Sequence, residues 1–265
     1  MPHWLTVWPD APGPWCFTTI AMALYAGAVL KLRSHPRPWA LRRSACFAAG
    51  CLSVLVSLSS PLAAADELFP IHVAQHLLLG MLAPLLFALS APVTLALRTL
   101  APAHRRGLVS LLHSRPSRLL TYAPVAGLLY TASLWVVYLT PLFAASLRHP
   151  LLHELLHLHF LITGCLLTWP LVGLDPVPAR GSTQVRIAVL LLALASHAAL
   201  AKLIYAGWLG GGLGRTLPLT AIHSGAEIMY YGGDLIELAL ALVFFSRWYA
   251  RTGRKPAWTA EATRP

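Results

Sequence analysis

Two segments of the sequence carry a pair of histidines four residues apart. His72 and His76 lie in IHVAQHLLLG, and His153 and His157 lie in PLLHELLHLHF. Side chains at positions i and i+4 of a helix share one face, where two imidazoles can bind the same metal ion. Since imidazole suits zinc, copper, iron and nickel, the pairs predict a metal site without choosing the metal.

Other ionisable residues in apolar surroundings extend the set of candidate ligands. His197 occurs in SHAALAK, and His223 and Glu227 stand one helical turn apart in AIHSGAEIMYYGG. Geometry alone disfavours His159, because it would lie ~240° around a helix from His153. The cysteines lie in apolar segments without a CxxC pair, so they predict neither a disulfide framework nor a redox motif.

The elements that must position these residues are apolar stretches of membrane-spanning length. Of the 265 residues, 57% are hydrophobic and 11% are charged, which is too little polar surface for a soluble globule. About 20 apolar residues in a helix cross the ~30 Å hydrocarbon core of a bilayer. We therefore expect an all-α, polytopic membrane bundle in one domain (1–265), with seven spans at about 15–32, 44–64, 71–97, 119–140, 150–173, 184–208 and 221–248.

The basic residues predict the orientation of this bundle. Cytoplasmic loops retain Lys and Arg, and these residues crowd the first, third and fifth loops and the C-terminal tail at 254–265, whereas the other loops hold only Arg148 and Arg215. The N-terminus is thus expected outside and the C-terminus inside. Topology therefore explains the net charge of +11, and no nucleic-acid partner is expected.

This orientation places the candidate ligands near the outer face. The spans that begin at 71, 150 and 221 enter from outside, so both histidine pairs and His223 lie near their outer ends. His197, on an outward-running span, lies roughly 16 Å from its outer end at ~1.5 Å per residue. Ionisable groups in hydrocarbon are costly and mark functional paths. We expect neutral imidazoles to bind the metal there, and binding to weaken below pH ~6.5.

The last span carries a polar stripe. Within about 80° of one another, at ~100° per residue, lie His223, Glu227, Tyr230, Asp234 and Glu237. Two interpretations stay open. The stripe is a proton path, or its carboxylates hydrogen-bond other helices or meet cytoplasmic arginines.

Three alternatives to a metal-delivery site remain. Residues 153–157 read HELLH, the H-E-x-x-H pattern of zinc proteases with Glu154 as general base, but Asp175 is ~33 Å away along the helix and cannot supply the third ligand. Histidines on opposing helices can instead hold a haem, and a scaffold with hydrogen-bonded histidines is the third alternative. We interpret the protease pattern as incidental and predict no enzymatic activity.

Three stretches of the later spans resemble a known family. They are FPIHVAQHLLLGMLAPLLFALSAP at 69–92, HELLHLHFLITGCLLTWPLVGLDP at 153–176 and, more loosely, AEIMYYGGDL at 226–235. These stretches are similar to the CtaG assembly factors of caa(3)-type cytochrome c oxidase. The family's histidine motifs map onto His72, His76, His157 and His159, so the resemblance restores His159 as a candidate ligand.

The resemblance implies a multi-pass protein of the bacterial cell (inner) membrane that serves the maturation of a haem-copper oxidase. Its implied cargo is copper, bound at the outer face and handed on in the manner of a metallochaperone, with haem or zinc as alternatives. Its implied partners are cytochrome c oxidase subunits and a periplasmic copper carrier, besides the lipid bilayer. The candidate ligands together are His72, His76, His153, His157, His159, His197, His223 and Glu227.

Overall fold

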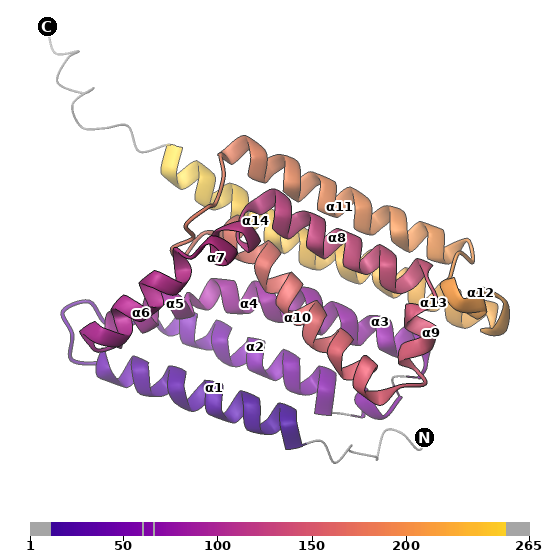
Figure 1. Cartoon of the computed structure of the whole chain (residues 1–265), viewed down its shortest axis with the longest axis horizontal. Helices are drawn as coiled ribbons and strands as arrows, with labels where there is room; N and C mark the ends of the chain where they lie inside the picture. The colour runs from indigo at the N-terminus through magenta and orange to yellow at the C-terminus, as the bar shows by residue number, and fades with distance from the viewer. Residues whose placement is uncertain (1–11, 60, 66, 253–265) are drawn as a thin grey trace, which may run out of the picture.

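The chain folds into a bundle of helices that run roughly along one long axis (Figure 1). In the computed structural model, which describes residues 12–59, 61–65 and 67–252, every regular element is helical. The first half contains α1 (Pro12–Lys31), α2 (Leu41–Ser59), the 3₁₀ turn η2 (Ala63–Ala65), α3 (Phe69–Leu77), the π-helical η3 (Leu78–Leu82), α4 (Ala83–Ser90), α5 (Pro92–Thr99), α6 (Pro102–Leu112) and α7 (Arg115–Leu120). The second half contains α8 (Ala123–Leu139), α9 (Leu142–Ser146), α10 (Pro150–Val172), α11 (Thr183–Tyr205), η4 (Gly210–Gly212), α12 (Leu213–Thr216), α13 (Leu219–Glu227), the π-helical η5 (Ile228–Gly232) and α14 (Gly233–Thr252).

Six helical stretches are long and apolar enough to cross a membrane. They are Pro12–Lys31, Leu41–Ser59, Phe69–Thr99, Pro150–Val172, Thr183–Tyr205 and Leu219–Thr252. α8 occupies the remaining predicted span and is apolar but has 17 residues. It begins later than the predicted 119 because Pro124, which suits the first turn of a helix, starts a new element after α7. The predicted tail at 254–265 lies outside the described residues.

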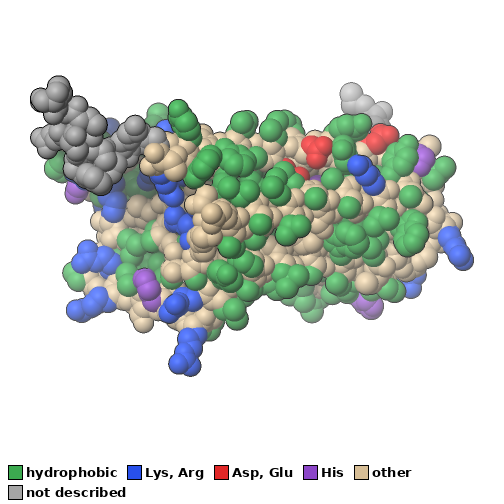
Figure 2. Space-filling view, turned by 90° about the horizontal axis from the view of Figure 1, so that it is seen from above, with side chains coloured by type: hydrophobic (Ala, Val, Ile, Leu, Met, Phe, Trp, Pro, Cys, Tyr) green, Lys and Arg blue, Asp and Glu red, His purple; other side chains and the backbone are tan. Residues whose placement is uncertain are grey.

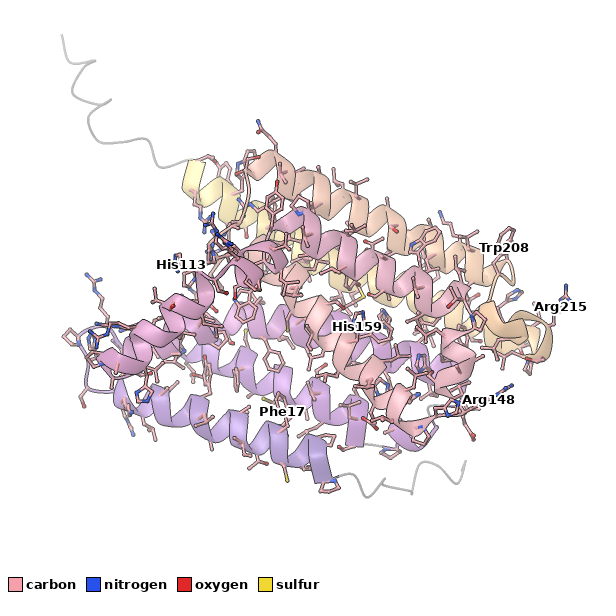
Figure 3. The ribbon with its side chains drawn as sticks, viewed as in Figure 1. Phe17, His113, Arg148, His159, Trp208 and Arg215 are labelled. Carbon is pink, nitrogen blue, oxygen red and sulfur yellow. The ribbon has the colours of Figure 1, made fainter. Side chains whose placement is uncertain are left out.

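The surface of the bundle is divided along its long axis. On the face that Figure 2 shows, hydrophobic side chains cover much of the middle, and most of the Lys and Arg side chains gather at one end. We call this the basic end; it holds α5, α6, α7 and the loop 173–182, and His113 marks it in Figure 3. The opposite end, which we call the histidine end, holds the first turns of α3 and α10 and is marked by Arg148 and Arg215. Exposed leucines around a bundle of this length are typical of a multi-pass membrane protein.

The predicted span at 71–97 is broken near its basic end. Ala91 adopts the left-handed conformation (φ 51°, ψ 56°) and separates α4 from α5. The break precedes Pro92, and proline disfavours the helical conformation in the residue before it. The carboxylate of Asp175 accepts hydrogen bonds from the backbone N–H groups of Val93 (3.2 Å) and Thr94 (2.7 Å), which satisfies the start of α5.

Close packing of α10 against η3 fixes the arrangement of the centre. α10 also contacts α4 and α8, while α3 contacts α13. A Cβ atom at Gly164 of α10 would collide with the carbonyl oxygen of Gly80, so only glycine permits this approach. The contact sets the position of α10 relative to the segment that continues α3.

Candidate metal centre

Three histidines from two helices meet at the histidine end. One ring nitrogen from each of His72, His153 and His157 lies within 4.8 Å of the others. The ring centroid of His72 is 5.7 Å from that of His153 and 6.2 Å from that of His157. All three side chains are buried. Nitrogens that share one ion through bonds of ~2.0–2.1 Å lie at most ~4.2 Å apart, so the three rings must move closer together to hold an ion. We call this group the three-histidine cluster.

The starts of two helices bring the cluster together. α3 begins at Phe69 and α10 at Pro150, each with a proline in its first turn, where the missing N–H costs nothing. His72 and His153 therefore lie in the first turn of their helices, and His157 follows His153 on the same face. The two histidines of α10 share one face, as their i, i+4 spacing predicts, and α3 places a third imidazole next to them.

Aromatic side chains enclose the cluster. The ring of Phe143 lies 4.4 Å from that of His72, and the ring of Tyr138 lies 6.2 Å from it. Both ring nitrogens of His72 and the hydroxyl of Tyr138 are buried without a hydrogen-bond partner among the described residues. Each such group costs about 1–3 kcal/mol, and a bound ion or water is an ordinary reason for it. This observation favours a ligand role for His72 over a hydrogen-bonded structural one.

Sequence reasoning missed Tyr138 and Phe143. The sequence holds no signal for them, because aromatic residues near the ends of apolar spans are equally well explained by the membrane interface.

His76 lies one turn deeper than the cluster. Its ring packs 4.4 Å from that of Phe160 and 6.1 Å from that of Tyr138, and it is not part of the group whose nitrogens meet. Both of its ring nitrogens are buried without a hydrogen-bond partner in the described part of the chain. The predicted pair on α3 is therefore divided between the cluster and a position directly beneath it.

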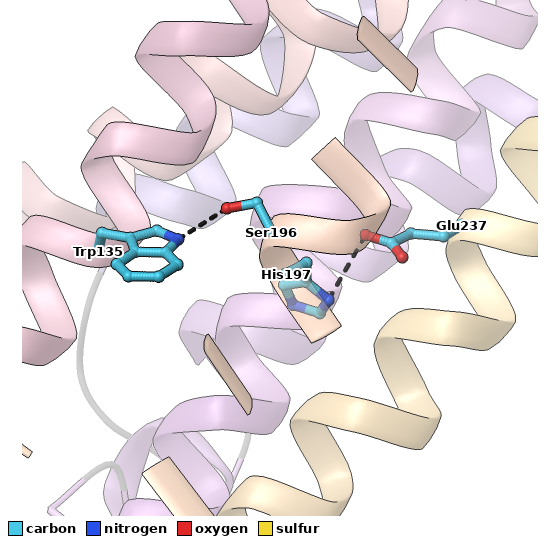
Figure 4. Close-up of polar contacts among 4 residues, drawn as sticks. All are labelled: Trp135, Ser196, His197 and Glu237. Carbon is cyan, nitrogen blue, oxygen red and sulfur yellow. Dashed lines mark hydrogen bonds and ion pairs between the residues drawn. The ribbon is translucent and has the colours of Figure 1, made fainter. Parts of the chain in front are cut away.

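His197 pairs with a carboxylate instead of joining the cluster. Its Nδ1 lies 3.4 Å from Oε1 of Glu237, and both side chains are buried (Figure 4). On the same helix, Ser196 accepts a hydrogen bond from Nε1 of Trp135 at 2.8 Å (Figure 4). A Cβ atom at Gly233 would collide with the His197 imidazole, so this glycine makes room for the pair. Glu237 thus contacts a side chain of another helix, α11.

The outer part of the stripe, His223 and Glu227, lies apart from Glu237. His223 stacks on Tyr205 with ring centroids 4.0 Å apart, and Glu227 is exposed in a cavity of about 350 Å³ that Lys202 also lines. The π-helical η5 lies between Glu227 and Glu237, and the wider turn rotates everything after it relative to a regular helix. Neither His223 nor Glu227 belongs to the three-histidine cluster.

His159 lies outside the cluster as well. It is exposed on α10, and its position is labelled in Figure 3. Its ring contacts that of Phe160 at 6.3 Å. This placement agrees with the helical spacing, which puts His159 on a different face of α10 from His153. It differs from the expectation, taken from the family's histidine motif, that His159 is a metal ligand.

A second cavity reaches the cluster from the side. It measures about 320 Å³, and its lining includes Glu154 and His157 of α10 together with Gly13, Pro14 and Phe17 of α1; of these, Phe17 is labelled in Figure 3. Glu154 is exposed, so a carboxylate lines the same cavity as one of the imidazoles. Asp175, by contrast, follows the far end of α10, where Nε1 of Trp169 donates to its carboxylate at 3.1 Å.

A helical bundle with membrane-length helices and a buried histidine cluster at one end defines a multi-pass membrane protein with a candidate metal centre. The chain belongs to the family of cytochrome c oxidase caa3 assembly factors, whose family model matches residues 23–251. This membership confirms the resemblance that the histidine motifs indicated.

The similar curated proteins are mycobacterial. Uncharacterized protein Mb0105 of Mycobacterium bovis and uncharacterized protein MT0111 of Mycobacterium tuberculosis are each 32% identical over 250 residues, covering 88% of this chain and 38% of their own length. Uncharacterized protein ML1998 of Mycobacterium leprae is 32% identical over 190 residues, covering 68% of this chain and 29% of its own. The chain thus spans less than half the length of these relatives. No solved structure matches.

Proposed function

We propose that this protein binds copper in the three-histidine cluster and delivers it during the assembly of a cytochrome c oxidase. The observation that carries the proposal is the convergence of His72, His153 and His157 within 4.8 Å in a family of oxidase assembly factors. Three imidazoles leave a coordination position open for exchange, and imidazole is a suitable ligand for copper.

The location of the cluster supports exchange with an external partner. In the proposed topology α8 completes seven spans, the basic end is cytoplasmic, and the histidine end faces outward. The cavity beside Glu154 and His157 then gives copper a route from the outer side. The exposed carboxylate of Glu154 attracts the cation, and the buried imidazoles retain it. The donor is a periplasmic copper carrier, and the acceptor is an oxidase subunit.

A genetic experiment tests this function. Cells that depend on this chain are given the wild type, His72→Ala with His157→Ala, or His113→Ala, whose exposed histidine lies at the opposite end. We expect the first variant to yield oxidase deficient in copper and the second to yield normal oxidase. Normal copper content with the double variant would refute delivery through this cluster.

A second candidate function is metal-dependent hydrolysis within the membrane. His72 supplies the third ligand that the HELLH pattern lacked, and Glu154 lines the same cavity as His157. Under this function Glu154→Gln abolishes cleavage of a membrane substrate and leaves metal binding intact. Under copper delivery, the same variant slows loading of copper and no cleavage is found.

An optical spectrum separates both functions from haem binding. A haem held by the histidines gives a Soret band in the purified protein, and a cluster that carries copper alone does not.

A further inference from the structure

Four arginines gather at the basic end, where α10, α11 and α14 meet. Arg180 lies in the loop 173–182, Arg186 in the first turn of α11, and Arg247 and Arg251 near the end of α14. Three of them, Arg186, Arg247 and Arg251, line a cavity of about 150 Å³. Its apolar walls come from Leu171, Val172, Phe244 and Trp248.

Backbone carbonyl groups hold these guanidinium groups in place. The carbonyl oxygen of Gly173 accepts hydrogen bonds from Nη2 of Arg247 at 3.2 Å and Nη2 of Arg251 at 3.1 Å. Nη1 of Arg186 donates to the carbonyl oxygen of Pro170 at 3.3 Å. The arginines are therefore fixed by the end of α10, but these acceptors carry no net charge.

No carboxylate of the described ranges neutralises the four arginines. Among the described residues, the buried carboxylate of Glu237 on α14 pairs with His197 instead. Asp175 belongs to the same loop as Arg180, but only its backbone oxygen accepts a bond from that arginine, at 2.9 Å. The carboxylate of Asp175 is taken by the start of α5 and by Trp169.

The four arginines include buried N–H groups that lack a hydrogen-bond acceptor among the described residues. Arg186 is only 7% exposed, and the Nε atoms of Arg180, Arg186 and Arg247 are buried without a hydrogen-bond partner among the described residues. Burial, followed by the positive charges of Arg251, Arg186 and Arg247, lowers the pKa of the Arg180 guanidinium. Buried charges of one sign destabilise a fold unless an anion compensates them.

We propose that this cavity binds a phosphate group, supplied by the headgroup of an anionic phospholipid. Guanidinium groups bind phosphate oxygens through paired, charge-assisted hydrogen bonds. Basic pockets between transmembrane helices on the cytoplasmic side are typical sites for such headgroups. The apolar walls of the cavity suit the glycerol and acyl part of a lipid, and the exposed Trp248 suits the membrane interface. The site is independent of the copper proposal.

Native mass spectrometry of the full chain tests the site. The protein is purified in neutral detergent and exposed to phosphatidylglycerol or phosphatidylcholine. The wild type should retain phosphatidylglycerol selectively, and Arg247→Gln with Arg251→Gln should retain it at least about tenfold more weakly. The matched control is Arg105→Gln with Arg106→Gln, which removes the same charge from exposed positions of α6 at the same end.

The remaining outcomes assign the ligand or reject the site. If inorganic phosphate without lipid raises the melting temperature of the wild type but not of the Arg247/Arg251 variant, the phosphate site stands and its source is the free anion. Equal retention of both lipids by the wild type, with no effect of phosphate, overturns the proposal without needing any variant to fold. An equal loss in the Arg105/Arg106 control also overturns it, because diffuse attraction then explains binding. A charge-preserving Arg247→Lys, Arg251→Lys variant should still weaken retention, since it loses the paired hydrogen bonds.

Discussion

His72 and His157 face each other across the interface of α3 and α10, with ring planes 28° apart and centroids separated by 6.2 Å. His153 completes the group one turn earlier on α10. Two helices that start at the same end of the bundle thus present imidazoles at the same level. This relationship turns a repeated sequence pattern into a candidate site for one ion.

Removal of a cluster histidine should weaken copper binding strongly. We expect His72→Ala to lower the copper affinity by more than about 100-fold. Even the loss of a residue that only hydrogen-bonds to a metal ligand lowers metal affinity roughly 10–100-fold. Competition titration against a copper chelator measures this change. The His113→Ala control should bind as the wild type does, and a similar loss in both variants would argue against a specific site.

A variant at His159 tests whether helical geometry or the family's histidine motif correctly identifies the copper ligands. The side chain of His159 is exposed and lies outside the cluster. We therefore expect His159→Ala to change copper affinity less than about threefold, since substitutions of exposed residues outside a site usually have small effects. The same chelator titration applies. A loss as large as that of His157→Ala would show that the bound state recruits His159 and that α10 rotates on loading.

The close approach at Gly164 should be needed for metal binding although no ligand is removed. Gly164→Ala forces α10 away from Gly80, which costs about 1–3 kcal/mol of folding stability and displaces His153 and His157 from His72. We expect both a lower melting temperature and weaker copper binding. Gly107→Ala is the matched control, since a Cβ atom there meets nothing within 4 Å. Unchanged copper affinity in Gly164→Ala would contradict the proposed role of this contact.

The His197–Glu237 pair should stabilise the bundle. Glu237→Ala leaves a buried imidazole without its partner, so we expect the free energy of unfolding to fall by about 1–3 kcal/mol. Glu237→Gln keeps an oxygen acceptor and should cost less. Denaturant titration in detergent measures the difference, with Asp234→Ala, an exposed carboxylate of the same helix, as control. Equal stability of Glu237→Ala and the wild type would refute this role.

Much of the helical layout could be predicted from the sequence, because apolar length and helical periodicity are local properties. The six membrane-length stretches and the shared face of His153 and His157 follow from them. The separation of Glu237 from Glu227 could not be predicted, since it depends on the π-helical η5, which has no simple sequence signal. The break at Ala91 did have a signal in Pro92.

The sequence also does not predict which helices lie next to one another. A single sequence does not show that α3 rather than α13 supplies the third imidazole, because that choice depends on close packing at Gly80 and Gly164. For the same reason the sequence placed arginines at the basic end but did not group Arg186 with Arg247 around one cavity.

X-ray absorption at the copper edge of the purified, copper-loaded protein tests whether the three-histidine cluster holds copper. Copper held by the three-histidine cluster should be near-stoichiometric, with imidazole scattering from His72, His153 and His157 that is lost in His72→Ala with His157→Ala and kept in His113→Ala. Copper retained with the same imidazole signature in the double variant would show that the ion is bound elsewhere.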